Sequence, residues 1–253
     1  MSQLAPAGSP SFAEPRTYRL LVAGVRDLTP RMRRIQLTDP SLSQFSCLPG
    51  QDVALVFARD EGTAVRRRYT IRHFDAERRL LELDFVMHGD GPGMRWAQAA
   101  RPGLSIETIG PRGKITLAAG VDWHLFAGDA TAVPGSLTMM EALPSEIPTH
   151  AFFQVDAPAE RQQLEGSDHN RAIEWRFDGD ELQHPDGIVA ALASADLPRE
   201  PGHAYLAGEV GLVQALKTSL LARGWNPNRI SAKAYWNRGR ANAGHGEPEI
   251  KAS

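Results

Sequence analysis

The stretch that decides the interpretation of this chain runs from Arg66 to Phe74 and reads RRRYTIRHF. Three consecutive arginines lead into an alternating Tyr-Thr-Ile segment, which predicts a strand with a basic end. Arg67 and Tyr69 are two residues apart, so they share one face, with Thr70 beside them. A guanidinium can grip a diphosphate while a tyrosine ring lies against a flat heterocycle. We therefore expect a cradle for a flavin; the alternative is a barrel strand with a solvated basic end.

Composition places the chain among folded globular proteins. It has 253 residues, of which 42% are apolar and 23% charged. No apolar run reaches the ~18 residues of a membrane span, and the start of the chain lacks the pattern of a signal peptide. The lone Cys47 excludes a disulfide framework within the chain. We expect a cytoplasmic protein with a disordered tail over residues 1–15.

Charge divides the chain into two parts. Residues 16–118 carry 17 Lys plus Arg against 11 Asp plus Glu, whereas residues 119–253 carry 11 against 18. This asymmetry predicts two domains with different partners, a basic one over 16–118 and an acidic one over 119–253. The excess of positive charge in the first is too small to indicate nucleic-acid binding.

Short alternating segments separated by turns predict a small antiparallel barrel in the first part. We expect six strands in this barrel. The predicted segments are Tyr18 to Val25, Arg33 to Thr38, Val53 to Phe57, Tyr69 to His73, Leu80 to Met87 and Leu104 to Thr108, followed by a closing stretch that ends near Leu117.

Strand and helix patterns alternate after Gly120, which predicts a doubly wound parallel sheet. Expected strands are Trp123 to Ala127, His150 to Val155, Ile173 to Phe177, Ala204 to Ala207 and Ile230 to Tyr235; expected helices are Pro134 to Leu143, Gly187 to Ala195 and Leu212 to Arg223. Ligands of such sheets bind at the carboxyl ends of the strands. The turns Ala127 to Pro134 and Ala207 to Gly211 are the candidates, although neither carries G-x-G-x-x-G.

A glycine-rich loop, His88 to Ala97 (HGDGPGMRWA), lies between an expected strand and a short helix. Its glycines allow close backbone approach, Pro92 suits a first helical position, and a helix N-terminus presents N–H groups to an anion. The loop is either a second phosphate-binding element or a turn that only caps a helix.

The order of six motifs resembles the siderophore-interacting protein family of ferric-siderophore reductases, within the ferredoxin reductase-like group. The motifs are R-x-Y-T, H-G-x-G-P-x-x-x-W-A, G-P-R-G, A-G-D-x-T-A-x-P, A-G-E and A-Y-W-x-R-G, and they span about Tyr18 to Arg240. One departure is Gly91-Pro92-Gly93, where many members have an extra residue and an alanine.

The resemblance implies that the barrel is an FAD-binding domain and that the parallel sheet is an NAD(P)-binding domain. It also implies a set of cofactor-binding residues and no catalytic side chain, with Thr70 and Thr131 facing the flavin. The implied FAD contacts are Arg67, Tyr69, Thr70, His88, Gly89, Gly91 and Trp96; the implied contacts at the flavin, nicotinamide and ribose are Gly128, Asp129, Thr131, Pro134, Gly208, Glu209, Tyr235 and Trp236. Hydride would pass from nicotinamide to flavin and single electrons from flavin to chelated ferric iron. The eight histidines lack ligand spacing, so we expect no protein-bound metal.

An anionic ferric siderophore is the expected substrate, with no nucleic-acid partner, no membrane insertion and a monomeric protein. Candidate docking residues are Arg66, Arg68, Arg72, Arg112, Lys114, Arg238 and Arg240. The alternatives are a general NAD(P)H:flavin oxidoreductase, a ferredoxin-type electron-transfer reductase and a non-enzymatic flavin or siderophore binding module. The choice between dinucleotides stays open: Asp156 favours NADH, whereas Arg161, His169 and Arg171 could accept NADPH.

Overall fold

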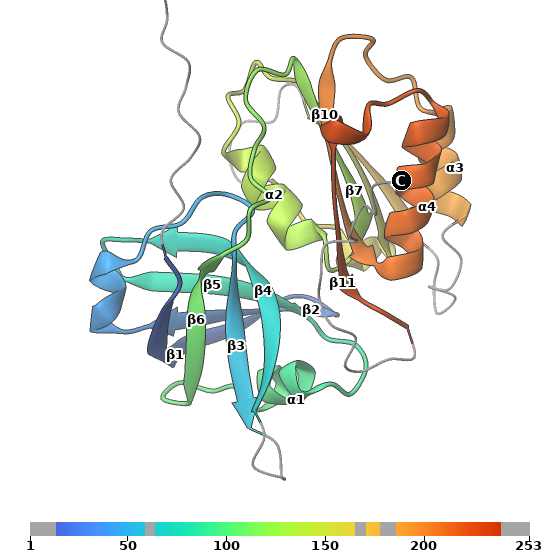
Figure 1. Ribbon diagram of the computed structural model, residues 1–253. Coiled ribbons are helices and arrows are strands. Elements are labelled where there is room, and N and C mark those ends of the chain that lie inside the picture. The colour runs from blue at the N-terminus through green and yellow to red at the C-terminus, as the bar shows by residue number, and fades with distance from the viewer. Residues whose placement is uncertain (1–13, 59–63, 165–170, 178–185, 239–253) are drawn as a thin grey trace, which may run out of the picture.

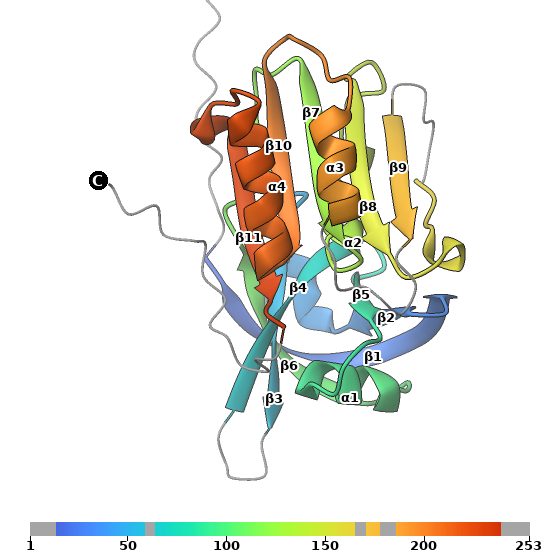
Figure 2. The same ribbon diagram turned by 90° about the vertical axis from the view of Figure 1, so that its right-hand side faces the viewer.

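The computed structural model describes residues 14–58, 64–164, 171–177 and 186–238. Figure 1 shows a barrel below a sheet flanked by helices, and Figure 2 gives the perpendicular view. Most of the predicted tail, residues 1–15, lies outside the described residues. Arg240 and His169 also lie outside them.

Six strands form a closed antiparallel barrel in the order β1-β2-β5-β4-β3-β6. Their bounds are β1 Arg16–Thr29, β2 Met32–Thr38, β3 Asp52–Ala58, β4 Ala64–Asp75, β5 Leu80–Val86 and β6 Ser105–Arg112. β1 is longer than predicted because it pairs with β2 along one half and with β6 along the other, with register shifts between Val22 and Gly24 and between Asp27 and Thr29. Alternating inward residues such as Leu20, Ile35 and Leu83 are fully buried in its core.

One strand boundary was predicted wrongly. The sequence predicts a strand that ends at Thr108 and then a closing strand that ends near Leu117, but a single strand, β6, runs without a break to Arg112. Arg112 still pairs with Asp52, and the shift in the β3–β6 register lets the strand continue through Pro111. Residues 113–122 are irregular and cross to the second domain.

The second half contains a five-stranded parallel sheet in the order β11-β10-β7-β8-β9. Its strands are β7 Trp123–Asp129, β8 Thr149–Val155, β9 Arg171–Phe177, β10 Gly202–Glu209 and β11 Ile230–Trp236; the helices are α2 Val133–Glu141, α3 Asp186–Ser194 and α4 Val210–Ala222. β7 is buried at every position, as expected for the centre of a parallel sheet. Helices α3 and α4 cover one face and α2 the other, so the predicted doubly wound arrangement is confirmed (Figure 2).

Helix α2 lies between the sheet and the barrel (Figure 1). Seven of its nine residues are buried, and its contacts with the barrel are made mainly with β4. The Thr138 hydroxyl donates to the Arg72 carbonyl at 2.7 Å. A Cβ on Gly135 would lie 2.9 Å from the Thr70 methyl, so a glycine here permits close packing. The helix thereby sets the angle at which the two halves meet.

Three short 3-10 turns and one further helix complete the described elements: Pro40–Gln44, Pro158–Glu160, Pro227–Arg229 and α1 Pro92–Ala99. Among the described residues, no helix combines the length and the apolar character that crossing a membrane requires.

Candidate functional site

Two adjoining pockets of about 560 and 290 Å³ lie where the barrel meets the carboxyl edge of the sheet. The larger is bounded by β4, the loop before α1 and the end of β11; the smaller is bounded by the ends of β7, β8 and β10 and by the β1–β2 hairpin. Both are lined by Val86, His88, Thr131, Trp236 and Arg238. The two pockets therefore form one continuous cleft.

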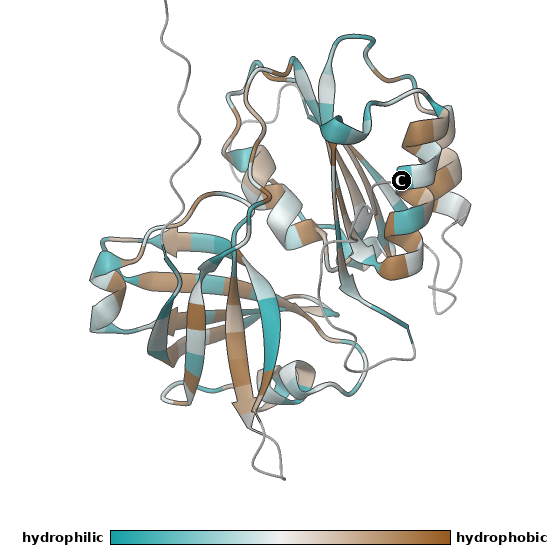
Figure 3. Cartoon of the chain, viewed as in Figure 1, coloured by the Kyte–Doolittle hydropathy of each residue, from teal (hydrophilic) through white to brown (hydrophobic). Residues whose placement is uncertain are grey.

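The RRRYT stretch lines the larger pocket, with Arg67, Arg68, Tyr69 and Thr70 all contributing. Figure 3 shows this hydrophilic part of β4 beside the hydrophobic β3. Thr70 reaches the sheet domain, because its hydroxyl lies 3.4 Å from the Tyr235 hydroxyl. The residues predicted as a cradle therefore lie together on the wall of the cleft.

Tyr69 is held by aromatic packing and by a glycine. Its ring centroid lies 4.2 Å from that of Phe85, and a Cβ on Gly93 would fall 1.8 Å from its hydroxyl. Gly93 is the position at which this chain departs from the family motif, and the space it leaves is taken by the phenol. Burial raises the pKa of Tyr69, so the hydroxyl stays protonated.

The loop before α1 offers backbone rather than side chains to the pocket. Gly91 is the N-cap of α1 and supplies no side-chain cap, while Pro92 occupies the first turn. A Cβ on Gly89 or on Gly91 would meet nothing within 4 Å, so these positions open onto the pocket. The His88 ring lies 5.1 Å from that of Trp236, at the boundary of the two pockets.

Trp96 does not lie where the resemblance placed it. Its ring packs 6.1 Å from Phe57 and 5.7 Å from Phe85, beneath the loop, and it lines neither pocket. Trp96 packs against the barrel core, to which the buried Ala97 also belongs. It contacts Phe85, whose ring also packs against Tyr69.

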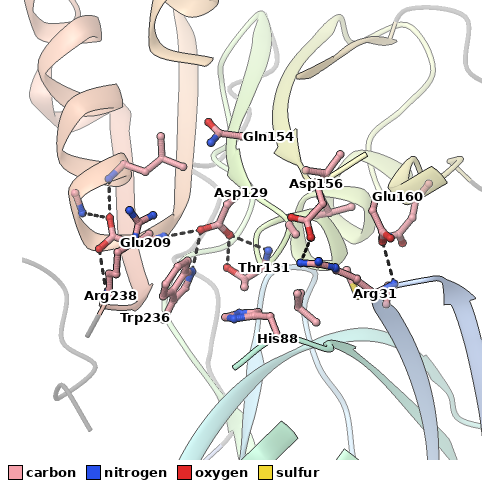
Figure 4. A pocket seen from close by; sticks show the side chains of 18 residues that line it. Arg31, His88, Asp129, Thr131, Gln154, Asp156, Glu160, Glu209, Trp236 and Arg238 are labelled. Carbon is pink, nitrogen blue, oxygen red and sulfur yellow. Dashed lines mark hydrogen bonds and ion pairs between the residues drawn. The ribbon is translucent and has the colours of Figure 1, made fainter. Parts of the chain in front are cut away.

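Asp129 ties together the ends of β7, β10 and β11 (Figure 4). One carboxylate oxygen accepts from the Thr131 amide and hydroxyl at 2.8 and 2.5 Å. The other accepts from the Glu209 amide at 2.7 Å and from the Trp236 indole at 2.9 Å. Asp129 therefore orients Thr131 and Trp236 rather than facing a ligand with its own free lone pairs.

Two of the predicted glycines serve this strand junction. A Cβ on Gly208, at φ +135°, would lie 2.6 Å from the Asp129 carboxylate, and one on Gly128 would lie 1.9 Å from the Ala207 carbonyl. Neither glycine lines a pocket. They permit close approach between strands, which differs from the direct cofactor contact that the resemblance implied.

Glu209 lines the smaller pocket and also caps α4. Its carboxylate accepts from the amides of Gly211 and Leu212 at 2.5 and 3.1 Å. Pro134 and Tyr235 line the larger pocket, and burial raises the pKa of Tyr235. The A-G-D and A-G-E turns thus converge on the cleft, as their positions after parallel strands predict.

The predicted docking residues are dispersed. Arg66 and Lys114 are exposed, Arg112 is half-buried at the end of β6, and Arg238 is exposed and lines both pockets. Arg68 lies in the pocket wall and pairs with Asp52 at 2.8 Å.

Arg72 requires a correction. It is 3% exposed, and its guanidinium binds both Glu141 oxygens at 2.6 and 2.7 Å. A second buried carboxylate, Asp84, lies 3.9 Å away. This arginine joins β4 to α2 and is not accessible to a substrate. The register of β4 against β5 shifts between Ile71 and His73, so a regular alternation does not extend through this residue.

Several residues of the cleft were not predicted from the sequence. Asp52 is 2% exposed at the start of β3, and Lys233 reaches it from β11 at 2.7 Å. In the smaller pocket, Arg31 pairs with Asp156, and its amide donates to Glu160 at 3.2 Å. The available signals were weak: an acid that opens an apolar strand, and a lysine within the otherwise uncharged segment Ile230–Trp236.

The sequence matches two family profiles in chain order. The profile described as "Siderophore-interacting FAD-binding domain" covers residues 58–115, and the one described as "Siderophore-interacting protein" covers residues 121–239. The chain belongs to the siderophore-interacting protein family. The predicted family is thereby confirmed, and the FAD-binding profile falls on the barrel that carries the RRRYT stretch.

Individual relatives agree. The ferric vibriobactin reductase ViuB of Vibrio cholerae is 34% identical over 190 residues, which is 71% of this chain and 67% of the relative. The NADPH-dependent ferric-chelate reductase of Escherichia coli is 28% identical over 168 residues, which is 65% of this chain and 63% of the relative. The crystal structure of a siderophore utilization protein from T. fusca superimposes with a TM-score of 0.83 at 29% identity, covering 93% of this chain and 98% of that one. The predicted barrel-plus-sheet fold is confirmed.

Proposed function

We propose that this chain is a flavin-dependent reductase that takes electrons from NAD(P)H and passes them through FAD to ferric iron held in a siderophore. The observation that carries the proposal is the continuity of the two pockets at His88, Thr131 and Trp236. A flavin in the larger pocket and a nicotinamide in the smaller would meet there. The names of the Vibrio and Escherichia relatives, both ferric reductases, support the same activity.

The residues of the larger pocket fit FAD. Open glycine positions and an uncapped helix start suit a diphosphate, and Arg67 adds a cation. Tyr69, Thr70 and Tyr235 lie together on the wall where a flat ring system would lie. The chemistry that bound FAD supplies is two-electron uptake from NAD(P)H followed by one-electron delivery to ferric iron.

The remaining tasks belong to the side chains. Asp129 fixes Thr131 and Trp236 at the boundary between the pockets, where the Trp236 and His88 rings lie 5.1 Å apart. Arg66, Arg112, Lys114 and Arg238 remain the proposed docking residues for an anionic chelate. We also propose that the two domains divide between residues 118 and 119, which lie between β6 and β7. The proposed protein is a cytoplasmic monomer.

The visible spectrum of the purified protein tests the proposal. Oxidised-flavin bands should be bleached by NADH or NADPH and restored under argon by a ferric chelate. Bands that neither dinucleotide bleaches would indicate a binding module. Bleaching without anaerobic re-oxidation by catecholate, hydroxamate or carboxylate chelates would indicate a general flavin or ferredoxin-type reductase.

A further inference from the structure

The smaller pocket lies where a parallel sheet holds a dinucleotide. It is bounded by residues directly after β7, β8 and β10, including Asp129, Asp156 and Glu209. The barrel closes it from the other side, because Arg31 at the turn between β1 and β2 lies against the segment after β8 (Figure 4). The adenosine ribose of a dinucleotide is commonly bound by a group that follows the second strand of such a unit. In this sheet that position is Asp156, one residue beyond β8.

The charged lining of this pocket is mainly acidic. Among the described residues, it contains four carboxylates and two guanidiniums: Asp129, Asp156, Glu160, Glu209, Arg31 and Arg238. A 2'-phosphate adds a charge of about −1.5 to −2 at neutral pH, so it would enter a region that already has an excess of negative charge.

Three of the four carboxylates are engaged by the protein backbone. Asp129 accepts from the amides of Thr131 and Glu209, and Glu209 caps α4. Glu160 accepts from the Arg31 amide and from the Thr29 hydroxyl, which fixes the hairpin. These three carboxylates therefore maintain the shape of the pocket.

Asp156 forms an ion pair with a partly exposed side chain of the barrel. Its carboxylate pairs with the Arg31 guanidinium, and the Arg31 side chain is 42% exposed whereas the Asp156 side chain is 13% exposed. An ion pair with one exposed partner is weak, so a ligand can compete for it. The pair orients the carboxylate toward the pocket that both residues line (Figure 4).

Two of the three basic residues that the sequence offered as phosphate ligands, Arg161 and Arg171, lie outside this pocket. Arg161 stacks on the Phe177 ring at 4.8 Å, and Arg171 donates to the Leu143 carbonyl at 2.9 Å. Arg171 begins β9 and is paired with Thr149, at the opposite end of the strands from the pocket. Neither arginine lines the pocket, and His169 lies outside the described residues.

We infer that this chain prefers NADH to NADPH, and that the Asp156 carboxylate sets the preference by accepting hydrogen bonds from the ribose diol and repelling a 2'-phosphate. The inference rests on the proposed function, since it names the electron donor of the same reaction. A carboxylate accepts both hydroxyl protons of a diol, whereas a phosphate beside it is a like charge. The inference separates this chain from the Escherichia relative, whose name specifies NADPH.

The test compares two probes that lack nicotinamide and cannot transfer hydride, ADP-ribose and 2'-phospho-ADP-ribose. Their dissociation constants are measured by isothermal titration calorimetry on the FAD-loaded full-length chain, alongside kcat/KM for NADH and NADPH. The wild type should bind ADP-ribose about tenfold more tightly, and the kcat/KM ratio should favour NADH by a similar factor. Equal or tighter binding of the phosphorylated probe would overturn the inference.

Asp156→Asn removes the charge and keeps the shape of the side chain. It should weaken ADP-ribose binding by about threefold to tenfold and strengthen binding of the phosphorylated probe. The matched control is Asp122→Asn, an exposed aspartate before β7 at the other end of the sheet, which should change neither constant. An unchanged ratio in Asp156→Asn, or tighter phosphate binding without any loss for ADP-ribose, would contradict the role of Asp156 as the diol ligand.

Failure of the proposed function would give a different result. A protein that is not a ferric-siderophore reductase would fail to reduce a ferric chelate, yet its affinity for the two probes would still be measurable. A working reductase that selects 2'-phospho-ADP-ribose would refute only the choice of dinucleotide.

Discussion

Lys233 of the sheet and Asp52 of the barrel form an ion pair of 2.7 Å across the domain interface, on the wall of the larger pocket. Arg68 binds the same carboxylate at 2.8 Å, so two cations from different domains share one acid that is 2% exposed. The Lys233 ammonium also lies 5.5 Å from the centre of the Tyr235 ring. This arrangement links the geometry of the pocket to the alignment of the two domains.

Lys233→Met should lower the free energy of unfolding by about 1–3 kcal/mol and weaken FAD binding, because a buried carboxylate loses one of its two cations. Urea denaturation and flavin fluorescence measure the two effects. Lys217→Met, on α4 and away from both pockets, is the matched control. The double change Asp52→Asn with Lys233→Met should recover part of the stability. Independent, additive effects would argue against a coupled pair.

Gly93→Ala should destabilise the protein by about 1–3 kcal/mol, since the added methyl would meet the Tyr69 hydroxyl within a packed region. Displacement of Tyr69 should also reduce the FAD content per chain. Thermal unfolding and the visible absorbance of the purified variant are the measurements. Gly91→Ala adds the same methyl into open space and should cost less stability. Equal stability and flavin content in the Gly93 variant and wild type would contradict the claim that the Tyr69 hydroxyl requires a glycine at position 93.

His124 should make the protein less stable in mild acid. Burial, and then the neighbouring His203, lower the pKa of His124 from 6.5 to about 4. Between these two pKa values, His124 is therefore protonated in the unfolded chain and neutral in the folded chain. The stability from the neutral ring is fully present above pH 6.5 and decreases as the pH falls toward 4, by on the order of 2 kcal/mol.

His124→Gln should reduce this loss of unfolding free energy in acid, which denaturation curves recorded from pH 7 to pH 4 measure. The exposed His73 provides the control, because His73→Gln should leave the acid-dependent loss of stability as in wild type. If the loss of stability in acid is unchanged in His124→Gln, another group causes it. Tyr205 lies 3.3 Å from the His124 ring nitrogen, and burial raises its pKa to about 12, so it does not titrate in this window.

The docking hypothesis predicts a split between two electron acceptors. Arg66→Gln with Lys114→Gln should raise the apparent KM for an anionic ferric chelate several-fold, on the order of 3- to 10-fold at low salt. NADH oxidation with a small neutral dye should be unaffected. A comparable loss with both acceptors would instead place the defect at the flavin or the dinucleotide.

Much of the fold could be predicted because local patterns and tertiary structure agree. The core strands alternate or are continuously apolar, and Pro92 and Pro134 begin helices where sequence rules place them. The convergence of RRRYT, the glycine loop and the two strand-to-helix turns on one cleft also followed from position in the chain.

Long-range pairing could not be predicted from one sequence. Arg72 and Arg67 look alike in an arginine-rich strand, yet α2 supplies Glu141 to one of them and not to the other. The resemblance implied cofactor contacts for Gly128 and Gly208, whereas a side chain at these positions would meet the neighbouring strand or the Asp129 carboxylate. Asp52, Arg31 and Glu160 form these contacts only where the two domains meet.

Helix α2 belongs to the packing of both halves, since it is covered by the sheet on one side and by β4 on the other. The chain is therefore modular in its topology but not in its stability. A fragment cut between the halves would leave the barrel without the helix that covers β4, or would leave α2 on the sheet with its β4-facing side open to solvent. Exchange of either half with that of a relative would require the surface around α2 to be exchanged with it.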